Sequence, residues 1–427
     1  MNKASLIIAA LSALVQYYDY HLFGFLAAKI AKNFLPVHDS LTVLLKTYLM
    51  MYLAVLMKPL GSIFLGRIGD IYGRQVTINI GLMVTACASF ILGILPSYES
   101  IGFLAPMLLL LLRICVVTFV SSGTDGIRIY IYESVSSKRK NLSSSLVTIS
   151  AVGGSFLASV SALLATLDFV PDNFWRLSFI CGSLAGITII TLRNRFTDSS
   201  LDLELKKDEN YEHYKQMPLM KIVKENIAFT FLGMILAGGI GATYHFNFIF
   251  FGTYNFEVLR NIHSSSMQLY ISAGIAMYAL ASIVGGFLAD SVSPRLVATI
   301  SAGLIGVLSI MQSYFVQDGK LSIPIYLAVS ALLPLVNIPC LTLLKSFIPK
   351  VIRQRLFSLV HALGSITISA STPVISTWLY SKTQIAWLPI LYFVGIISLM
   401  ALVLNVLFWL RSGNQYDGMS AKKLYSV

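Results

Sequence analysis

Long apolar runs recur from one end of the chain to the other, with short polar links between them. The pattern predicts helices at 6–32, 42–66, 75–95, 103–132, 142–166, 174–195, 226–252, 267–290, 294–316, 322–345, 355–378 and 385–411. A helix needs about 20 apolar residues to cross a bilayer, whereas a barrel strand needs about half as many and alternates in polarity. Because these runs are long and do not alternate, we predict an all-α membrane protein with twelve transmembrane helices.

A charged stretch over 196–225 is the longest polar segment between two predicted helices. It separates two equal groups, so we expect an N-terminal six-helix bundle over 1–195, a cytoplasmic central loop over 196–225, and a C-terminal six-helix bundle over 226–427 that ends in a short tail. Transporters built from two such repeats bind substrate between them and expose the site to each side of the membrane in turn. The layout therefore favours a secondary transporter that works by alternating access.

The distribution of charge predicts the orientation. Only 12% of the residues are charged, against about 25% in soluble proteins. Most of the 31 Lys and Arg residues lie at the chain ends and in the links on one side of the predicted bundle. Basic residues favour the cytoplasmic side, so both termini are expected in the cytoplasm. This asymmetry explains the net charge of +12, and we expect no nucleic-acid partner, no cofactor and no metal.

The link between the second and third predicted helices reads Gly66-Arg67-Ile68-Gly69-Asp70-Ile71-Tyr72-Gly73-Arg74. Glycines let two helices approach and turn within a short link, while Asp70 can cap the next helix and Arg74 can bind a carboxylate on a neighbouring helix end. A weaker copy with Gly286 and Asp290 stands at the corresponding place in the second half. One such link is compatible with an ordinary tight turn, whereas two copies in corresponding places are a strong signal.

These two links resemble the signature loop of the major facilitator superfamily. The resemblance implies a cytoplasmic latch that stabilises the outward-open state, with an acidic partner at the end of the fourth predicted helix. The implied latch residues are Gly66, Gly69, Asp70, Gly73, Arg74, Glu133 and Asp290. We therefore predict that the side chains of Asp70, Arg74 and Glu133 form a cluster.

The stretch Gln16-Tyr17-Tyr18-Asp19-Tyr20-His21-Leu22-Phe23-Gly24-Phe25 resembles the first-helix signature of the metabolite:proton symporter branch of that superfamily. Further resemblances occur at 58–61, 96–102, 175–179, 348–353 and 372–379. Within the branch, the proline/glycine-betaine transporters are most similar. The resemblance implies import of a small polar metabolite with protons, either a zwitterion such as proline or betaine or a small carboxylate, across a bacterial inner membrane. The implied partners are this solute, protons and the lipid bilayer, and a monomer is expected.

Three positions at which the branch carries acids differ in this chain. Gln16 precedes the first-helix aromatics, Gly123 ends a Ser-Ser-Gly stretch where the branch has Gly-Gly-Glu, and Ser346 precedes the Phe-Pro link. These departures leave two alternatives open, namely a facilitator or exchanger that does not use protons and a transport-inactive sensor on the same fold. The sequence contains no catalytic cluster, so an enzyme is not expected.

Ionisable residues inside apolar helices are costly and are therefore candidates for function. Asp19 lies in the middle of the first predicted helix beside Tyr17 and Tyr18, with Gln16 on the same face. We expect Asp19 to carry the proton or to bind a substrate cation, and Arg113 in the fourth helix to bind a carboxylate. The alternative for both is a structural role, such as an ion pair between them.

Two further pairs are candidates for the same site. Asp125 and Arg128 are three residues apart in a predicted helix and face the same side, so they either replace a missing acid or neutralise each other. Tyr244 and Asn247 interrupt an apolar helix beside several glycines, as in helices that line transporter cavities, although a glycine-rich packing surface explains the glycines equally well. Lys58 is expected to extend its charge outward along its flexible stem.

Overall fold

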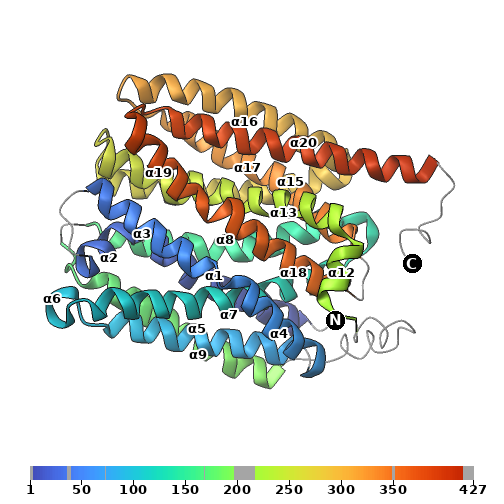
Figure 1. Cartoon of the computed structure of the whole chain (residues 1–427), viewed down its shortest axis with the longest axis horizontal. Helices are drawn as coiled ribbons and strands as arrows, with labels where there is room; N and C mark the ends of the chain where they lie inside the picture. Colours follow the sequence, from blue (N-terminus) through green and yellow to red (C-terminus); the bar gives the residue numbers. More distant parts are fainter. Residues whose placement is uncertain are drawn as a thin grey trace.

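The computed structural model describes residues 3–35, 40–72, 74–167, 169–196, 217–348 and 352–416. Within these ranges the regular structure is entirely helical. The helices run side by side along the long axis of the molecule (Figure 1). The predicted all-α fold class is confirmed.

The first half of the chain fills the first six predicted positions. Two positions are made by pairs of helices: α1 (Lys3–Phe25) continues into α2 (Ala27–Phe34), and α3 (Ser40–Val55) continues into α4 (Lys58–Tyr72). The others are α5 (Arg74–Ile94), α7 (Leu104–Ser134), α8 (Lys140–Leu164) and α9 (Phe174–Phe196). The links contain α6 (Tyr98–Ile101) and the single turn η1 (Ser137–Arg139).

The second half begins with the short helix α12 (Leu219–Glu225). The seventh position is composite, with α13 (Ile227–Tyr244), η2 (His245–Phe250), α14 (Phe251–Thr253) and η3 (Tyr254–Val258). It is followed by α15 (Ser264–Ser291), α16 (Pro294–Gln317) and α17 (Ile323–Ser346). The eleventh is again composite, with α18 (Arg353–Gly364), η4 (Ser365–Ser369) and α19 (Ser371–Thr383), and α20 (Leu388–Tyr416) is the twelfth.

The helices have the length and composition of membrane spans. Ten stretches within the described ranges are long and apolar enough to cross a bilayer. The first and third predicted positions are filled by α1 and by the shorter apolar stretch Ile78–Ile94 of α5, so the arrangement agrees with twelve spans. Large apolar side chains also cover the outside, with Phe64, Leu280 and Leu402 exposed by 68%, 65% and 61%. An apolar outer surface of this kind fits a lipid solvent, so the chain is a multi-pass membrane protein.

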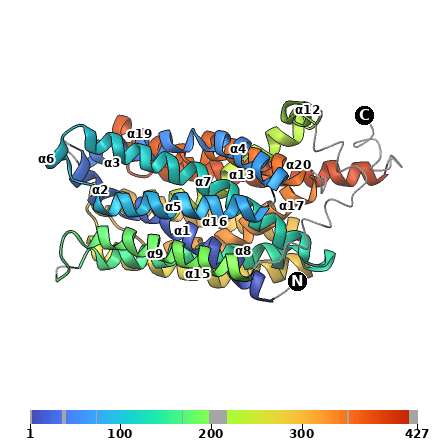
Figure 2. The same ribbon diagram turned by 90° about the horizontal axis from the view of Figure 1, so that it is seen from below.

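The two halves of the chain meet along the middle of the molecule. Helices α16, α17 and α20 lie on one side and α5, α7 and α9 on the other, with α1, α8 and α13 between them (Figure 1). Seen from below, helices of both halves run along the same long axis (Figure 2). The largest contact between the halves joins α8 to α15, and α18 packs on α4 and α7. The boundaries predicted for the two bundles stay a prediction, because most of the segment 196–225 lies outside the described residues.

Two helices change their winding beside the middle of the molecule. η2 and η4 are π-helical, and they interrupt the seventh and eleventh spans. The polar interruption expected at Tyr244 and Asn247 coincides with the change from α13 to η2. π-Helical segments leave backbone groups less regularly paired and occur preferentially at functional sites. They therefore mark where the second half faces the cavity described below.

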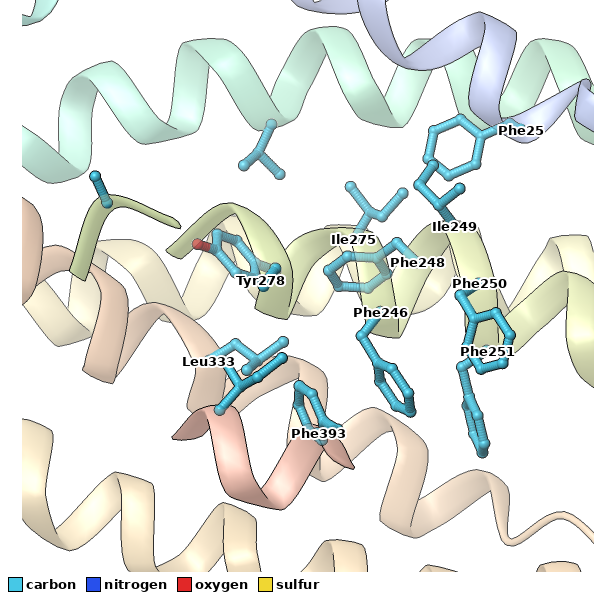
Figure 3. Packing of buried hydrophobic residues seen from close by; sticks show 14 of the residues in the cluster. Phe25, Phe246, Phe248, Ile249, Phe250, Phe251, Ile275, Tyr278, Leu333 and Phe393 are labelled. Carbon is cyan, nitrogen blue, oxygen red and sulfur yellow. The ribbon is translucent and has the colours of Figure 1, made fainter. Parts of the chain in front are cut away.

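Aromatic side chains fill the core of the second half around η2. The rings of Phe246 and Phe393 stack with their centroids 4.5 Å apart and their planes within 10° (Figure 3). On the other side of η2, Ile249 lies next to Phe25 of α1 (Figure 3). The Tyr48 hydroxyl of α3 donates to the Ile249 carbonyl at 3.3 Å. The same aromatic core thus holds η2 in place and contributes to contacts between the halves.

Candidate functional site

A cavity of about 140 Å³ lies between the two halves of the chain. An ordered water needs about 10–15 Å³ on the same measure, so the cavity has room for a small metabolite. Both halves contribute aromatic and basic side chains to its wall. These are Tyr17, Tyr20, His21, Lys58 and Arg128 from the first half and Tyr244, His245, Tyr278, Phe357 and His361 from the second.

Lys58 lies in the cavity wall, although its charge was predicted to point outward. Its side chain is buried, with 7% of the residue exposed, and it lines the cavity instead of extending outward. The ammonium donates to the Ser365 hydroxyl of the second half at 3.3 Å and lies 5.3 Å from the Tyr20 ring centre. No carboxylate of the described ranges forms an ion pair with it. The expectation of an outward charge is wrong, because the side chain is buried and its ammonium bonds to η4 of the second half.

Asp125 joins the two halves beneath the cavity wall. This buried carboxylate of α7 lies 3.0 Å from His361 Nδ1 of α18, and Arg128 donates to it at 3.1 Å. Arg128 also donates to the hydroxyl of Tyr17 and lies over the Tyr17 ring. Arg128, Tyr17 and His361 face the cavity while Asp125 lies behind them. The predicted pairing of Asp125 with Arg128 is present, and His361 adds a partner from the other half that sequence spacing does not indicate.

Asp19 points away from the cavity, into the first half. It is 1% exposed, and its Oδ1 would stand 2.3 Å from a Cβ atom added at Gly182 of α9. Neither carboxylate oxygen makes a hydrogen bond within the described ranges. The neighbouring Tyr18 hydroxyl donates to the Ser178 carbonyl at 2.9 Å and thereby ties α1 to α9. Asp19 and Tyr18 are therefore buried between helices of one half, and their predicted roles at the substrate remain predictions.

Gln16 and Arg113 are likewise buried outside the central cavity. Gln16 is fully buried between α1, α5 and α7. The Arg113 guanidinium lies 4.3 Å from the Phe23 ring centre and donates to the Tyr20 carbonyl at 3.3 Å. It lines a separate small pocket with Tyr20 and Tyr48. Arg113 thus stacks on an aromatic ring and bonds to a backbone carbonyl, as arginines in helix packing do. Its predicted contact with a substrate carboxylate remains a prediction.

The two predicted site residues of the seventh span, Tyr244 and Asn247, lie in different places. Tyr244 lines the cavity, and its ring lies 4.5 Å from that of His21. Asn247 lies one turn further inside the second half, where its amide donates to the Ser330 hydroxyl at 2.9 Å. Asn337 of α17 does face the cavity and donates to Thr243 and Tyr278. Tyr244 is therefore placed to meet a solute, whereas Asn247 bonds within its own half.

Polar contacts close the bundle at the end where α1 begins and α20 ends, called here the terminal end. Asp290 accepts hydrogen bonds from the backbone of Asn141 and Leu142 at the start of α8. Arg353 pairs with Glu133 at 2.7 Å. These contacts join α15 to α8 and α18 to α7, so they connect the two halves.

Buried Lys345 adds a further contact at the terminal end by donating to Ser144 at 2.7 Å. Glu133 and Asp290, two of the predicted latch residues, thus do join elements at this end. Gly73 and the side chains of Asp70 and Arg74 lie outside the described residues, as do the burial and contacts of Gly66 and Gly69, so the predicted cluster of Asp70, Arg74 and Glu133 stays a prediction.

Several residues of the cavity wall were not among the predicted site residues, and among them are three basic or titratable side chains from different helices. Lys58, His245 and His361 come from three different helices and meet only because α4, η2 and α18 converge. One signal was available in the sequence: Tyr20-His21 in the first span is repeated as Tyr244-His245 in the seventh. Equivalent positions of two repeated bundles face the same central space, which makes such a repeated dipeptide a candidate.

Two helical halves that enclose a cavity lined by aromatic, basic and apolar side chains are the architecture of a secondary transporter of the alternating-access type. The sequence profile of the Major Facilitator Superfamily matches residues 9–311, and the chain belongs to this superfamily. The chain is therefore a membrane transporter and not an enzyme. Among solved structures it is similar to a D-xylose-proton symporter, with a TM-score of 0.72, 14% identity, and coverage of 94% of this chain and 96% of the other.

Relatives with described activities are similar along almost the whole chain. The proline/betaine transporter of Escherichia coli (strain K12) is 23% identical over 421 residues, which cover 95% of this chain and 83% of the relative. A protein of Staphylococcus aureus (strain COL), described as a candidate proline/betaine transporter, is 23% identical over 425 residues, covering 97% and 90%. The predicted resemblance to the superfamily and to this group of transporters is confirmed.

Proposed function

We propose that this chain imports a small polar metabolite that carries a carboxylate, together with protons, by alternating access. The observation that supports this most directly is the buried Lys58 ammonium, which lines the central cavity and has no carboxylate partner within the described ranges. A buried charge without a partner is costly, and a solute carboxylate would supply the missing partner. Tyr17, Tyr20 and Tyr244 would enclose the rest of a small solute.

The proposed proton-coupling group is Asp125. Its carboxylate contacts His361 of the other half at 3.0 Å, so a change in its protonation acts directly on a contact between the halves. Arg128, which pairs with Asp125 and reaches the cavity, would transmit the same change to the solute. This assignment differs from the sequence-based preference for Asp19, whose carboxyl lies away from the cavity. The two acids are therefore separate candidates for the same role.

Two sets of contacts would act as gates. At the terminal end these are the pairs Arg353–Glu133 and Asp290–Asn141. At the opposite end the Tyr48 hydroxyl bonds to the Ile249 carbonyl. Breaking one set while keeping the other would expose the cavity to one side only, as alternating access requires. Termini in the cytoplasm, as the basic residues predict, would make the terminal end the cytoplasmic gate.

The test is transport by the purified protein in liposomes. Uptake of labelled proline, glycine betaine and a small dicarboxylate is followed with and without an inward proton gradient, for the native chain and for Asp125→Asn, Asp19→Asn and Lys58→Gln. We expect gradient-driven accumulation that Asp125→Asn abolishes. Lys58→Gln should raise the KM by roughly tenfold or more, because a charged hydrogen bond is lost.

The other outcomes are equally informative. Accumulation lost in Asp19→Asn but retained in Asp125→Asn would assign coupling to Asp19. Uptake that only equilibrates, whatever the gradient, would contradict proton symport and leave a facilitator or exchanger. A KM unchanged by Lys58→Gln would contradict the carboxylate assignment.

A further inference from the structure

Each half of the chain places a Tyr-His dipeptide in the cavity wall from its first membrane-spanning helix. Tyr20 is the eighteenth residue counted from Lys3 in α1, and Tyr244 is the eighteenth counted from Ile227 in α13. All four side chains of Tyr20-His21 and Tyr244-His245 line the cavity. The two dipeptides thus occupy equivalent positions of the two halves.

The four rings contact one another reciprocally across the boundary. His21 lies 4.5 Å from Tyr244, and His245 lies 6.4 Å from Tyr20, measured between ring centres. Each histidine therefore faces the tyrosine of the other half. A solute at this place would touch both halves at once, which makes it sensitive to their relative movement.

In both histidines a backbone carbonyl lies within hydrogen-bond distance of Nδ1. His21 Nδ1 lies 3.2 Å from the Tyr17 carbonyl and 2.7 Å from the Ser155 hydroxyl, whose own proton is donated to the Ala151 carbonyl. His245 Nδ1 lies 3.1 Å from the Ser369 carbonyl and 2.8 Å from the Ser369 hydroxyl. A carbonyl oxygen only accepts, so the carbonyl contact of each ring favours the tautomer with the proton on Nδ1, in which Nε2 is an acceptor.

Both Nε2 atoms are without a hydrogen bond in the described ranges, on side chains that line the cavity. The Lys58 ammonium stands nearby, 5.3 Å from the centre of the Tyr20 ring. The wall thus offers two acceptors, one from each half, next to a cation. The matching solute has a carboxylate at one end and at least two N–H or O–H donors close to it.

We propose that His21 and His245 act together as a donor-reading pair, that is, two acceptors that bind N–H or O–H groups of the solute. The pair selects carboxylates with free N–H or O–H groups, such as the ammonium of an α-amino or imino acid. It disfavours fully methylated ammonium compounds. This inference rests on the proposed transport of a carboxylate through the same cavity. The two Nε2 atoms accept one donor each, so the solute bridges the halves. A quaternary ammonium has no N–H, and it would leave both acceptors buried and unpaired.

The test uses three ligands that differ only in methylation: L-proline, N-methyl-L-proline and N,N-dimethyl-L-proline. Their binding to the purified full-length protein is measured by calorimetry, so that the readout does not depend on transport. We expect affinity to fall with each methyl group, by roughly ten- to a hundredfold from the first ligand to the third. The ratio of the affinities for the first and third ligands is called here the spread. His245→Phe keeps a ring but removes the acceptor, and it should reduce the logarithm of the spread to less than half. The matched control His263→Phe, at an exposed histidine outside the cavity, should leave the spread unchanged.

Equal affinities for the three ligands, a preference for the dimethylated one, or binding of none of them would each overturn the donor-reading pair. A spread that survives intact in His245→Phe would also overturn it. The variant Lys58→Gln distinguishes failure of the donor-reading pair from failure of the proposed function. If Lys58→Gln weakens carboxylate binding while the methylation series is flat, the carboxylate site stands and the histidine inference falls. If it weakens nothing, the carboxylate assignment itself has failed.

Discussion

The side-chain amide of Gln16 lies directly against Gly123, and a Cβ atom added at Gly123 would stand 3.3 Å from Gln16 Nε2 and 3.6 Å from Oε1. These are two of the three positions at which the symporter branch carries acids. Two carboxylates at such a contact would share a proton or repel each other. Gln16 and Gly123 contact each other, and neither carries an acid. This contact therefore has no carboxylate that could bind a proton. Asp125 and Asp19 are therefore the acids to test for coupling.

Replacing the Gln16 amide should not destabilise the protein. Both polar atoms of Gln16 are buried without a hydrogen bond in the described ranges, so Gln16→Met should leave the thermal midpoint unchanged or raise the stability by up to about 1–2 kcal/mol. The control Tyr18→Phe removes a bond to the Ser178 carbonyl and should lower stability by about 1 kcal/mol. Thermal unfolding in detergent measures both. A lower midpoint for Gln16→Met would mean that the amide has a partner, such as a bound water.

Adjacent glycines of α8 should differ sharply in their tolerance of a methyl group. A Cβ atom at Gly154 would stand 2.0 Å from the Leu14 carbonyl oxygen and 2.9 Å from the Tyr18 nitrogen, both backbone atoms of α1. At Gly153 the nearest atom is the flexible end of Leu14, at 3.6 Å. Gly154→Ala should therefore cost about 1–3 kcal/mol through overpacking, and Gly153→Ala should cost little. Equal midpoints for the two variants would refute this account of how α1 and α8 approach.

A bulky residue at Gly286 should open the terminal end. A Cβ atom there would meet Ser145 Oγ at 2.0 Å and the Leu142 Cα at 3.1 Å, across the contact between α15 and α8. Gly286→Val should push these helices apart and favour states open at that end. In a background without the native cysteines, a cysteine replacing buried Ser144 should then react severalfold faster with a maleimide. Gly306→Val, which meets no atom within 4 Å, is the control. The same reaction rate in both variants would argue against a gate at this contact.

The pair Arg353–Glu133 should show energetic coupling. Its atoms are 2.7 Å apart and its side chains are only 14% and 6% exposed, so solvent screens it weakly. In a double-mutant cycle of Arg353→Gln and Glu133→Gln, the apparent free energy of unfolding should deviate from additivity by about 0.5–3 kcal/mol. The exposed pair Lys221–Glu225, at 59% and 37%, should deviate by less than about 0.5 kcal/mol. Additive effects at both pairs would show that the buried pair does not hold the halves together.

The helices and their order could be predicted because a bilayer imposes a single length on every apolar span. The predicted segment 226–252, for example, begins one residue before α13 and ends within α14. Side-chain placement could not be predicted in the same way. Asp19 and Tyr20 are neighbours in α1, yet Tyr20 lines the cavity and the Asp19 carboxyl lies against α9. Which face of α1 meets the cavity depends on how that helix packs, and periodicity is a poor guide in a helix that is apolar all round.

Local composition and spacing within one helix were enough to predict the class of protein, its membrane-spanning helices and the Asp125–Arg128 pair. Three contacts became visible only in the folded protein. Lys58 bonds to the other half, His361, 236 residues away in the chain, bonds to Asp125, and two Tyr-His dipeptides face each other. These contacts join helices from opposite halves. Their geometry depends on how two separately packed bundles meet, which no local pattern encodes.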